Sequence, residues 1–119
     1  MSIENLQTAI LNAIQRRDEL VSEFRQKNSE AADASAKYKN AHAKAMLLNI
    51  EGKNAEERKA KAEIAVETEL FRHKLTEAEA EGVKMAVFAE ADKISALQSL
   101  LRLERDEIAA IQYGQRTGA

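Results

Sequence analysis

The chain contains no cysteine, no proline and no tryptophan, and it has only four glycines in 119 residues. The lack of cysteine excludes disulfides and thiolate metal sites, and it fits a reducing compartment. No β-branched run of strand length lies between turn residues, so no strand is predicted. These absences leave an all-helical chain as the fold to expect.

Long apolar runs are also missing, since none approaches the roughly 18 residues that a membrane-spanning helix needs. The first ten residues, MSIENLQTAI, carry an acidic and not a basic charge. They are therefore expected to be neither a signal peptide nor a transit peptide. The sequence predicts a cytoplasmic protein without membrane association.

Charged residues make up 32% of the chain, a proportion that together with many alanines and leucines is typical of long helices. Ser2 is placed to cap a first helix over residues 3–50. A heptad frame runs through this helix, and twelve of its fourteen positions are apolar. This first seam consists of Ile3, Leu6, Ile10, Ala13, Arg17, Leu20, Phe24, Lys27, Ala31, Ala34, Tyr38, Ala41, Ala45 and Leu48.

Gly52 predicts the end of this helix, because glycine readily adopts the left-handed conformation found at helix ends. Residues 51–54 then form a turn, and Asn54 caps a short helix over residues 55–67. A long helix follows over 69–112, with a frayed tail at 113–119. Its predicted seam is Ala80, Val83, Val87, Glu90, Ile94, Leu97, Leu101, Glu104, Ile108 and Ile111. Upstream, a shifted frame of Phe71, Leu75 and Ala78 predicts a stutter near Gly82.

The predicted fold is an all-α single domain, a long antiparallel helical hairpin with a short middle helix. Several apolar residues lie off the seams, and exposed apolar patches usually mark an interface. We therefore expect a homo-oligomeric bundle or ring. The predicted interface residues are Leu11, Ile14, Val21, Phe88, Leu100 and Leu103. The alternative is a monomer in which the short helix folds back over these residues.

Side chains for catalysis are scarce. There are two histidines, His42 and His73, and no grouping that resembles a catalytic triad or a phosphate-binding loop. Glu69, His73 and Glu77 share one helix face at a spacing that can hold a divalent metal. Such a row is more often a solvated face with pairing between residues four apart. No catalytic residue, metal or cofactor is predicted.

Charge is distributed unevenly. Residues 37–61 contain seven basic and three acidic residues, whereas residues 62–92 contain three basic and eight acidic ones. Folding at Gly52 would gather the cations at one end, and an oligomer would repeat that end often enough to hold a polynucleotide. The predicted nucleic-acid-binding residues are Lys44, Lys53, Arg58, Lys59 and Lys61. The alternative is a solvated basic face that balances the acidic one. Tyr38 could stack on a base through its ring, or it could belong to the core. Its seam position favours the core.

The segment EGKNAEERKAKAEIAVE, residues 51–67, resembles a recurring element of small all-helical proteins of tailed phages and prophages, encoded near recombination genes. The order of elements is similar to that of UvsY-type recombination mediators, which form rings on single-stranded DNA and help to load a recombinase. The likeness of residues covers only the turn Gly52-Lys53-Asn54 and Arg58, Lys59 and Lys61.

This resemblance implies a phage-encoded, non-catalytic accessory of DNA recombination or replication that binds single-stranded DNA as an oligomer. Its implied partners are DNA and a recombinase or a single-strand-binding protein. The alternative function is a coiled-coil interaction module, an adaptor or an inhibitor of a host factor, without nucleic-acid binding. A third possible function is that of a structural helix in the virion or its assembly.

Overall fold

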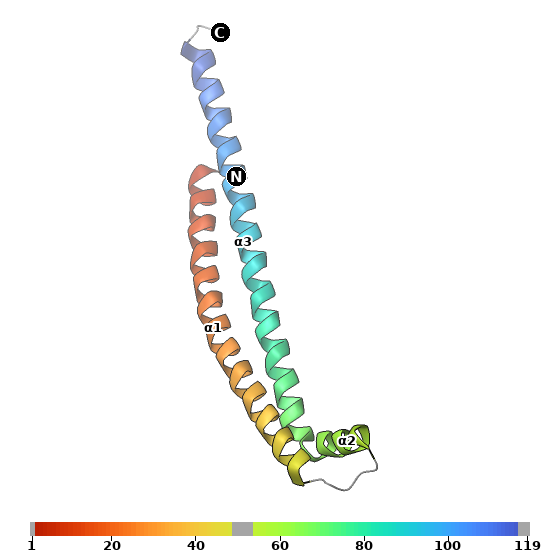
Figure 1. Ribbon diagram of the computed structural model, residues 1–119. Coiled ribbons are helices and arrows are strands. Elements are labelled where there is room, and N and C mark those ends of the chain that lie inside the picture. The colour runs from red at the N-terminus through yellow and green to blue at the C-terminus, as the bar shows by residue number, and fades with distance from the viewer. Residues whose placement is uncertain (1, 49–53, 117–119) are drawn as a thin grey trace. The chain divides into compact units, whose positions relative to one another are not determined.

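The computed structural model describes residues 2–48 and 54–116, and these form three helices (Figure 1). They are α1 (Ile3–Leu48), α2 (Ala55–Ala65) and α3 (Glu67–Arg116). The all-helical prediction is confirmed, since the described ranges contain no strand. Within the same ranges, no helix combines the length and the apolar character that crossing a bilayer requires. Most of the predicted turn, including Gly52 and Lys53, lies outside the described residues.

The chain divides into two compact units. The first unit consists of Met1–Val21 and Met85–Ala119, and the second is Ser22–Lys84. Both α1 and α3 contribute residues to each unit. This division is understandable, because a side chain on a long helix contacts only residues within a turn or two of its own level.

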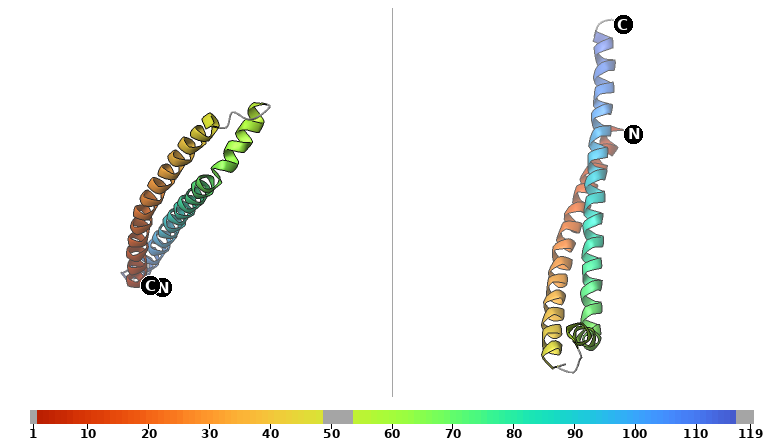
Figure 2. Two further views of the ribbon diagram at one scale, coloured as in Figure 1. Left: turned by 90° about the horizontal axis from the view of Figure 1, so that it is seen from below. Right: turned by 45° about the vertical axis from the view of Figure 1, so that its right-hand side comes forward.

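In the first unit, the start of α1 lies beside the later part of α3, as the views in Figures 1 and 2 show. Leu6 and Ile10 on α1 and Ile94 on α3 are buried there, as the predicted seams require. The last turns of α3 extend past the start of α1 (Figure 2). Ile108 and Ile111 are therefore exposed although they continue the seam.

In the second unit the seam is built from small side chains. Ala31 and Ala34 are buried on α1, and Thr76 and Ala80 are buried on α3. Small residues allow two helices to approach closely, so burial here comes from contact between the helices themselves. Along the whole of α1, every predicted seam position except Leu48 is buried or partly buried. The heptad prediction for α1 is thus confirmed.

An ion pair joins the two long helices in this unit. Lys27 occupies a seam position, and its Nζ donates a hydrogen bond to Glu79 on α3 at 3.3 Å. Glu30, one turn further along α1, lies 3.7 Å from the same nitrogen. The hydrogen bond to Glu79, together with the nearby charge of Glu30, raises the pKa of Lys27. A lysine at a core-facing position is thereby kept charged and partnered.

The predicted frame at the start of α3 is wrong. Phe71 is 68% exposed, Leu75 is 43% exposed and Ala78 is exposed as well. The residues that face α1 are instead Glu69, His73 and Thr76, which continue the downstream seam with the same seven-residue spacing. No stutter occurs near Gly82, because α3 keeps one frame through this region.

Two local contacts explain why polar residues occupy that frame. The ring of His73 stacks on Tyr38 of α1, with centroids 5.5 Å apart and planes 8° from parallel. The Thr76 hydroxyl donates to the backbone carbonyls of Arg72 and His73 at 2.9 and 3.0 Å. A buried hydroxyl that is satisfied in this way costs little. Both side chains can therefore replace the aliphatic residues that a seam normally uses.

The boundary between α2 and α3 is the single residue Val66. Its φ of −113° and ψ of 27° depart from helical values, while its N–H still bonds to the carbonyls of Ala62 and Ile64. Its side chain is 5% exposed. The chain therefore bends while the N–H and the carbonyl of Val66 both stay hydrogen-bonded, and α2 runs at an angle to the first turns of α3 (Figure 1). The bend ends α2 two residues earlier than predicted.

At its other end α3 continues to Arg116, where the sequence predicts a frayed tail from residue 113. No proline interrupts the backbone there, and Gly114 lies within the helix. The cost of one glycine in a helix interior is only about 1 kcal/mol. The backbone hydrogen bonds of this 50-residue helix offset that cost, so the helix continues beyond Gly114.

Side-chain caps begin α1 and α2, as predicted. The Ser2 Oγ accepts the N–H of Asn5 at 3.1 Å. Asn54, in an extended conformation, accepts the N–H of Glu57 on its Oδ1 at 2.8 Å. Each cap satisfies a backbone donor that has no partner within the helix.

Removal of the second cap gives a direct test of its role. We expect Asn54→Ala to destabilise α2 by about 1 kcal/mol and to speed amide exchange in its first turn. Asn54→Ser keeps the acceptor and should behave like the unaltered protein. Asn40→Ala, at an exposed position within α1, serves as a control and should not destabilise the protein. Hydrogen exchange followed by mass spectrometry measures all three, and equal exchange in Asn54→Ala and Asn54→Ser would contradict this role for the cap.

Candidate nucleic-acid interface

The short helix α2 is held against α1 by one small apolar contact. Ala62 is fully buried and packs with Ala45 of α1 and with Val66. Tyr38 and Met46 lie at the edge of this cluster, which we call the α2 contact. An alanine at the centre lets the two helices approach closely. The opposite face of α2 remains exposed to solvent.

Three of the predicted DNA-binding residues lie on α2. Lys59 and Lys61 are exposed, and Arg58 is partly buried. Lys44 is exposed on α1, next in sequence to Ala45 of the α2 contact. The structure thus places these four cations at the same end of the second unit. The fifth, Lys53, lies outside the described residues.

Carboxylates are interspersed among these cations. Glu57 lies 3.7 Å from the Nζ of Lys61, and the sequence of α2 has as many glutamates as basic residues. On α1, Lys37 pairs with Asp33 at 3.0 Å. Asp33 precedes the sequence window that showed the positive excess. The basic end is therefore less positive than counting along the sequence suggests.

Tyr38 is partly buried and packs against the α2 contact, in keeping with its seam position. One face of its ring is covered by His73, and His42 packs against it at 5.8 Å between centroids with planes tilted by 45°. The ring that base stacking would need is thus already engaged within the protein. His42 Nε2 and His73 Nδ1 are buried and have no hydrogen-bond partner. These three rings form one cluster where α1 meets the start of α3.

The row Glu69, His73 and Glu77 does not form a metal centre. His73 is turned into the stack with Tyr38, and its Nε2 lies 3.8 Å from Glu77. Across the described parts of the chain, no group of three or more histidine, aspartate or glutamate side chains is close enough to hold a metal ion. The row contributes one weak ion pair and part of the helix contact.

The predicted interface residues remain accessible. Leu11, Phe88, Leu100 and Leu103 are between 47% and 67% exposed, and Ile14 and Val21 are partly buried. Within the second unit, α2 packs on Ala45 of α1 and on Val66.

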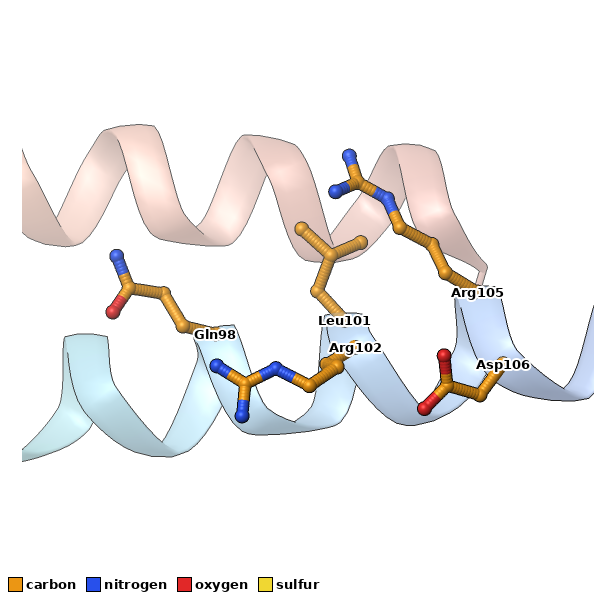
Figure 3. A pocket seen from close by; sticks show the side chains of 5 residues that line it. All are labelled: Gln98, Leu101, Arg102, Arg105 and Asp106. Carbon is orange, nitrogen blue, oxygen red and sulfur yellow. The ribbon is translucent and has the colours of Figure 1, made fainter.

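These residues fall on two different faces of the first unit. Leu101 points from α3 toward α1 (Figure 3), and the pocket that it lines with Gln98, Arg102 and Arg105 marks one side of this helix contact. Leu11 lines a concave surface with Leu101 and Arg105 and so belongs to that same side.

The seven-residue repeat assigns the remaining interface positions. It puts Phe88 at the heptad position of Arg102 and puts Ile14 and Val21 on the Leu11 side of α1, whereas Leu100 and Leu103 lie on the opposite side of Leu101. The sequence could not separate these two faces, because the separation depends on how α1 is rotated against α3.

Comparisons with protein-family models, with curated proteins and with solved structures gave no match. Conclusions about function therefore rest on the arrangement of charge and apolar surface in this chain.

Proposed function

We propose that this protein is a non-catalytic, homo-oligomeric scaffold that binds single-stranded DNA, as an accessory of phage recombination or replication. In this proposal the chain folds as an antiparallel hairpin and presents the α2 end to DNA. The pairs Lys27–Glu79 and Tyr38–His73 support the hairpin, because the order of the partners on α3 is the reverse of that on α1.

The observation that carries the proposal is the α2 contact. By packing Ala62 on Ala45, it brings cations from two helices to one end of the second unit. Lys44, Arg58, Lys59 and Lys61 then form a cluster that we call the basic end. Phosphate recognition needs such cations held together and accessible.

Oligomerisation is part of the proposal for an energetic reason. Four cations on one protomer make few phosphate contacts, whereas binding at physiological salt is sustained by about six to ten contacts. Two or more protomers reach that number. The exposed Leu11, Phe88, Leu100 and Leu103 supply the apolar surface that such an assembly would bury.

A partner protein completes the proposed role. Residues 77–90 contain four acidic side chains against one basic one. This acidic flank suits a basic surface on a recombinase or a single-strand-binding protein. The protein would act by positioning DNA and partner together, without making or breaking bonds.

Fluorescence anisotropy with a labelled single-stranded oligonucleotide tests the proposal. We expect Lys59→Glu combined with Lys61→Glu to weaken binding at least about tenfold and to reduce the dependence of affinity on salt. The control is Arg16→Glu combined with Arg25→Glu, which changes the net charge equally at exposed positions of α1 far along the helix from Lys44. It should weaken binding far less. Absence of binding at low salt, indifference to salt, or an equal loss in both variants would contradict DNA binding.

One observation favours a second candidate function, a protein-interaction module without DNA binding. The charges on α2 balance, and several exposed apolar side chains, among them Leu11 and Leu103, lie in the first unit and not on α2. For such a module, Phe88→Ser or Leu103→Ser should abolish activity, for example capture of its partner from infected host cells. The lysine substitutions on α2 should then leave activity unchanged.

A further inference from the structure

α3 carries a second heptad row in addition to the seam that faces α1. Its positions alternate in steps of three and four residues, as those of the first seam do. The second row consists of Ala86, Ala89, Lys93, Ala96, Leu100, Leu103, Glu107 and Ala110. All of them belong to the first unit, and all are exposed except the partly buried Ala86. A helix with two such rows is shaped to contact two other helices.

The composition of the second row suits close helix packing. Leu100 and Leu103, 47% and 61% exposed, stand at its middle. Alanines flank them on both sides, and alanine lets a neighbouring backbone approach. Exposed leucines in a row of this kind leave apolar area in water that a second helix would remove.

The row contains two charged residues, and their signs select its partner. Lys93 precedes the leucine pair and Glu107 follows it. If two copies packed in parallel, lysine would face lysine and glutamate would face glutamate. In antiparallel packing, Lys93 of each copy lies near Glu107 of the other, twice over, because the pair has two-fold symmetry. The row is therefore self-complementary in one orientation.

We infer that α3 of a second copy of this chain packs antiparallel along the second row, with the two-fold axis between Leu100 and Leu103. This inference deepens the homo-oligomeric part of the proposed function and names its contact. Leu100 lies opposite Leu103 of the second copy, and Ala96 lies opposite Glu107. Lys93 lies opposite Ala110, about 4.5 Å along the axis from Glu107, well within the reach of a lysine side chain.

The inference also assigns different roles to the two faces of the first unit. Leu100 and Leu103 belong to the dimer contact. Leu11, Ile14 and Phe88 lie on the other side and are left for a different neighbour. An isologous contact on one face closes a dimer, so the second face is what would extend the assembly beyond two copies.

Crosslinking tests the relative orientation of the two α3 helices. Because the chain has no native cysteine, an introduced cysteine is the only one that can react. Ala96→Cys and Ala110→Cys are prepared separately and treated with a short bis-maleimide. In the antiparallel pair, residues 96 and 110 of different copies are about 4.5 Å apart along the axis, but like positions are about 16 Å apart or more. We expect covalent dimers only when the two variants are mixed. Parallel packing predicts covalent dimers with each variant alone. Packing through a different face predicts no covalent dimer with either variant or with the mixture. Both results would overturn the inference.

Charge reversal tests the same contact without crosslinking. Lys93→Glu and Glu107→Lys should each weaken self-association at least about tenfold, since each turns two attractions into repulsions. The variant that combines Lys93→Glu with Glu107→Lys should restore self-association. Arg102→Glu, on the face shown in Figure 3, is the control and should have little effect.

Sedimentation velocity measures self-association without DNA, so its outcome is independent of whether the basic end binds DNA. A monomer at every concentration, or a double variant as weak as the single ones, would refute the antiparallel contact even if DNA binding is found. A restored dimer that does not bind DNA would support the contact and refute the proposed function.

Discussion

Leu6→Ala is expected to lower the free energy of unfolding by about 2–5 kcal/mol. Leu6 is fully buried, and it has the largest such side chain in the described residues. Its truncation removes apolar contacts and leaves a cavity where α1 packs on α3. Two rigid helices cannot close such a gap without displacing the contacts on either side. Urea denaturation followed by circular dichroism gives the change in free energy.

Leu47→Ala is the matched control, since Leu47 lies on the same helix and is 79% exposed. It should change the free energy by no more than about 0.5 kcal/mol. Hydrogen exchange adds spatial detail. Because Leu6 belongs to the first unit, protection should fall more in that unit than in Ser22–Lys84. Equal destabilisation by the two substitutions would show that Leu6 is not the packing centre of the first unit.

The heptad of α1 could be predicted from sequence because helix burial repeats with a fixed period. Leu6, Ile10, Leu20 and Ala45 all follow that period, and all are buried. Lys27 follows the same period although it is charged, because it pairs with Glu79 on the other helix. Periodicity identifies the buried face of a helix even where individual residues are polar.

The start of α3 shows where this reasoning fails. Phe71 and Leu75 are the more apolar residues, yet His73 and Thr76 face α1. The choice depends on Tyr38, which provides a ring for His73 to stack on, and on backbone carbonyls that accept the Thr76 hydroxyl. The stack joins residues far apart in the sequence, and the hydrogen bonds satisfy the Thr76 hydroxyl within its own helix. A hydrophobicity pattern predicts neither kind of contact.

The candidate site was predictable to a similar extent. The cap at Asn54 is a local signal and could be recognised directly. The electrostatic strength of the basic end could not, because it depends on ion pairs such as Lys37–Asp33 and Lys61–Glu57. Counting charges in a window treats every cation as available. A structure shows which of them are already neighbours of a carboxylate.

Ala62→Lys is expected to detach α2, at a cost of about 3 kcal/mol to its docking, because it puts an unpaired charge at a fully buried position. Arg58 and Lys59, one turn earlier on the same helix, add like-charge repulsion. An 11-residue helix is marginal in water without tertiary contacts, so a detached α2 should also lose helical structure. Hydrogen exchange in residues 55–65 measures this loss.

Ala60→Lys adds the same charge to the same helix at an exposed position, close to Glu56 and Glu57. It should leave α2 docked and should strengthen DNA binding, since it adds a cation to the basic end. Ala62→Lys adds that cation as well but should bind DNA no better than the unaltered protein, because the cluster it joins is no longer held together. If both variants strengthen binding equally, cations bind DNA whether or not α2 is docked, and the α2 contact has no part in recognition. The difference between two lysines, two residues apart, thus measures how far DNA binding depends on the packing of Ala62.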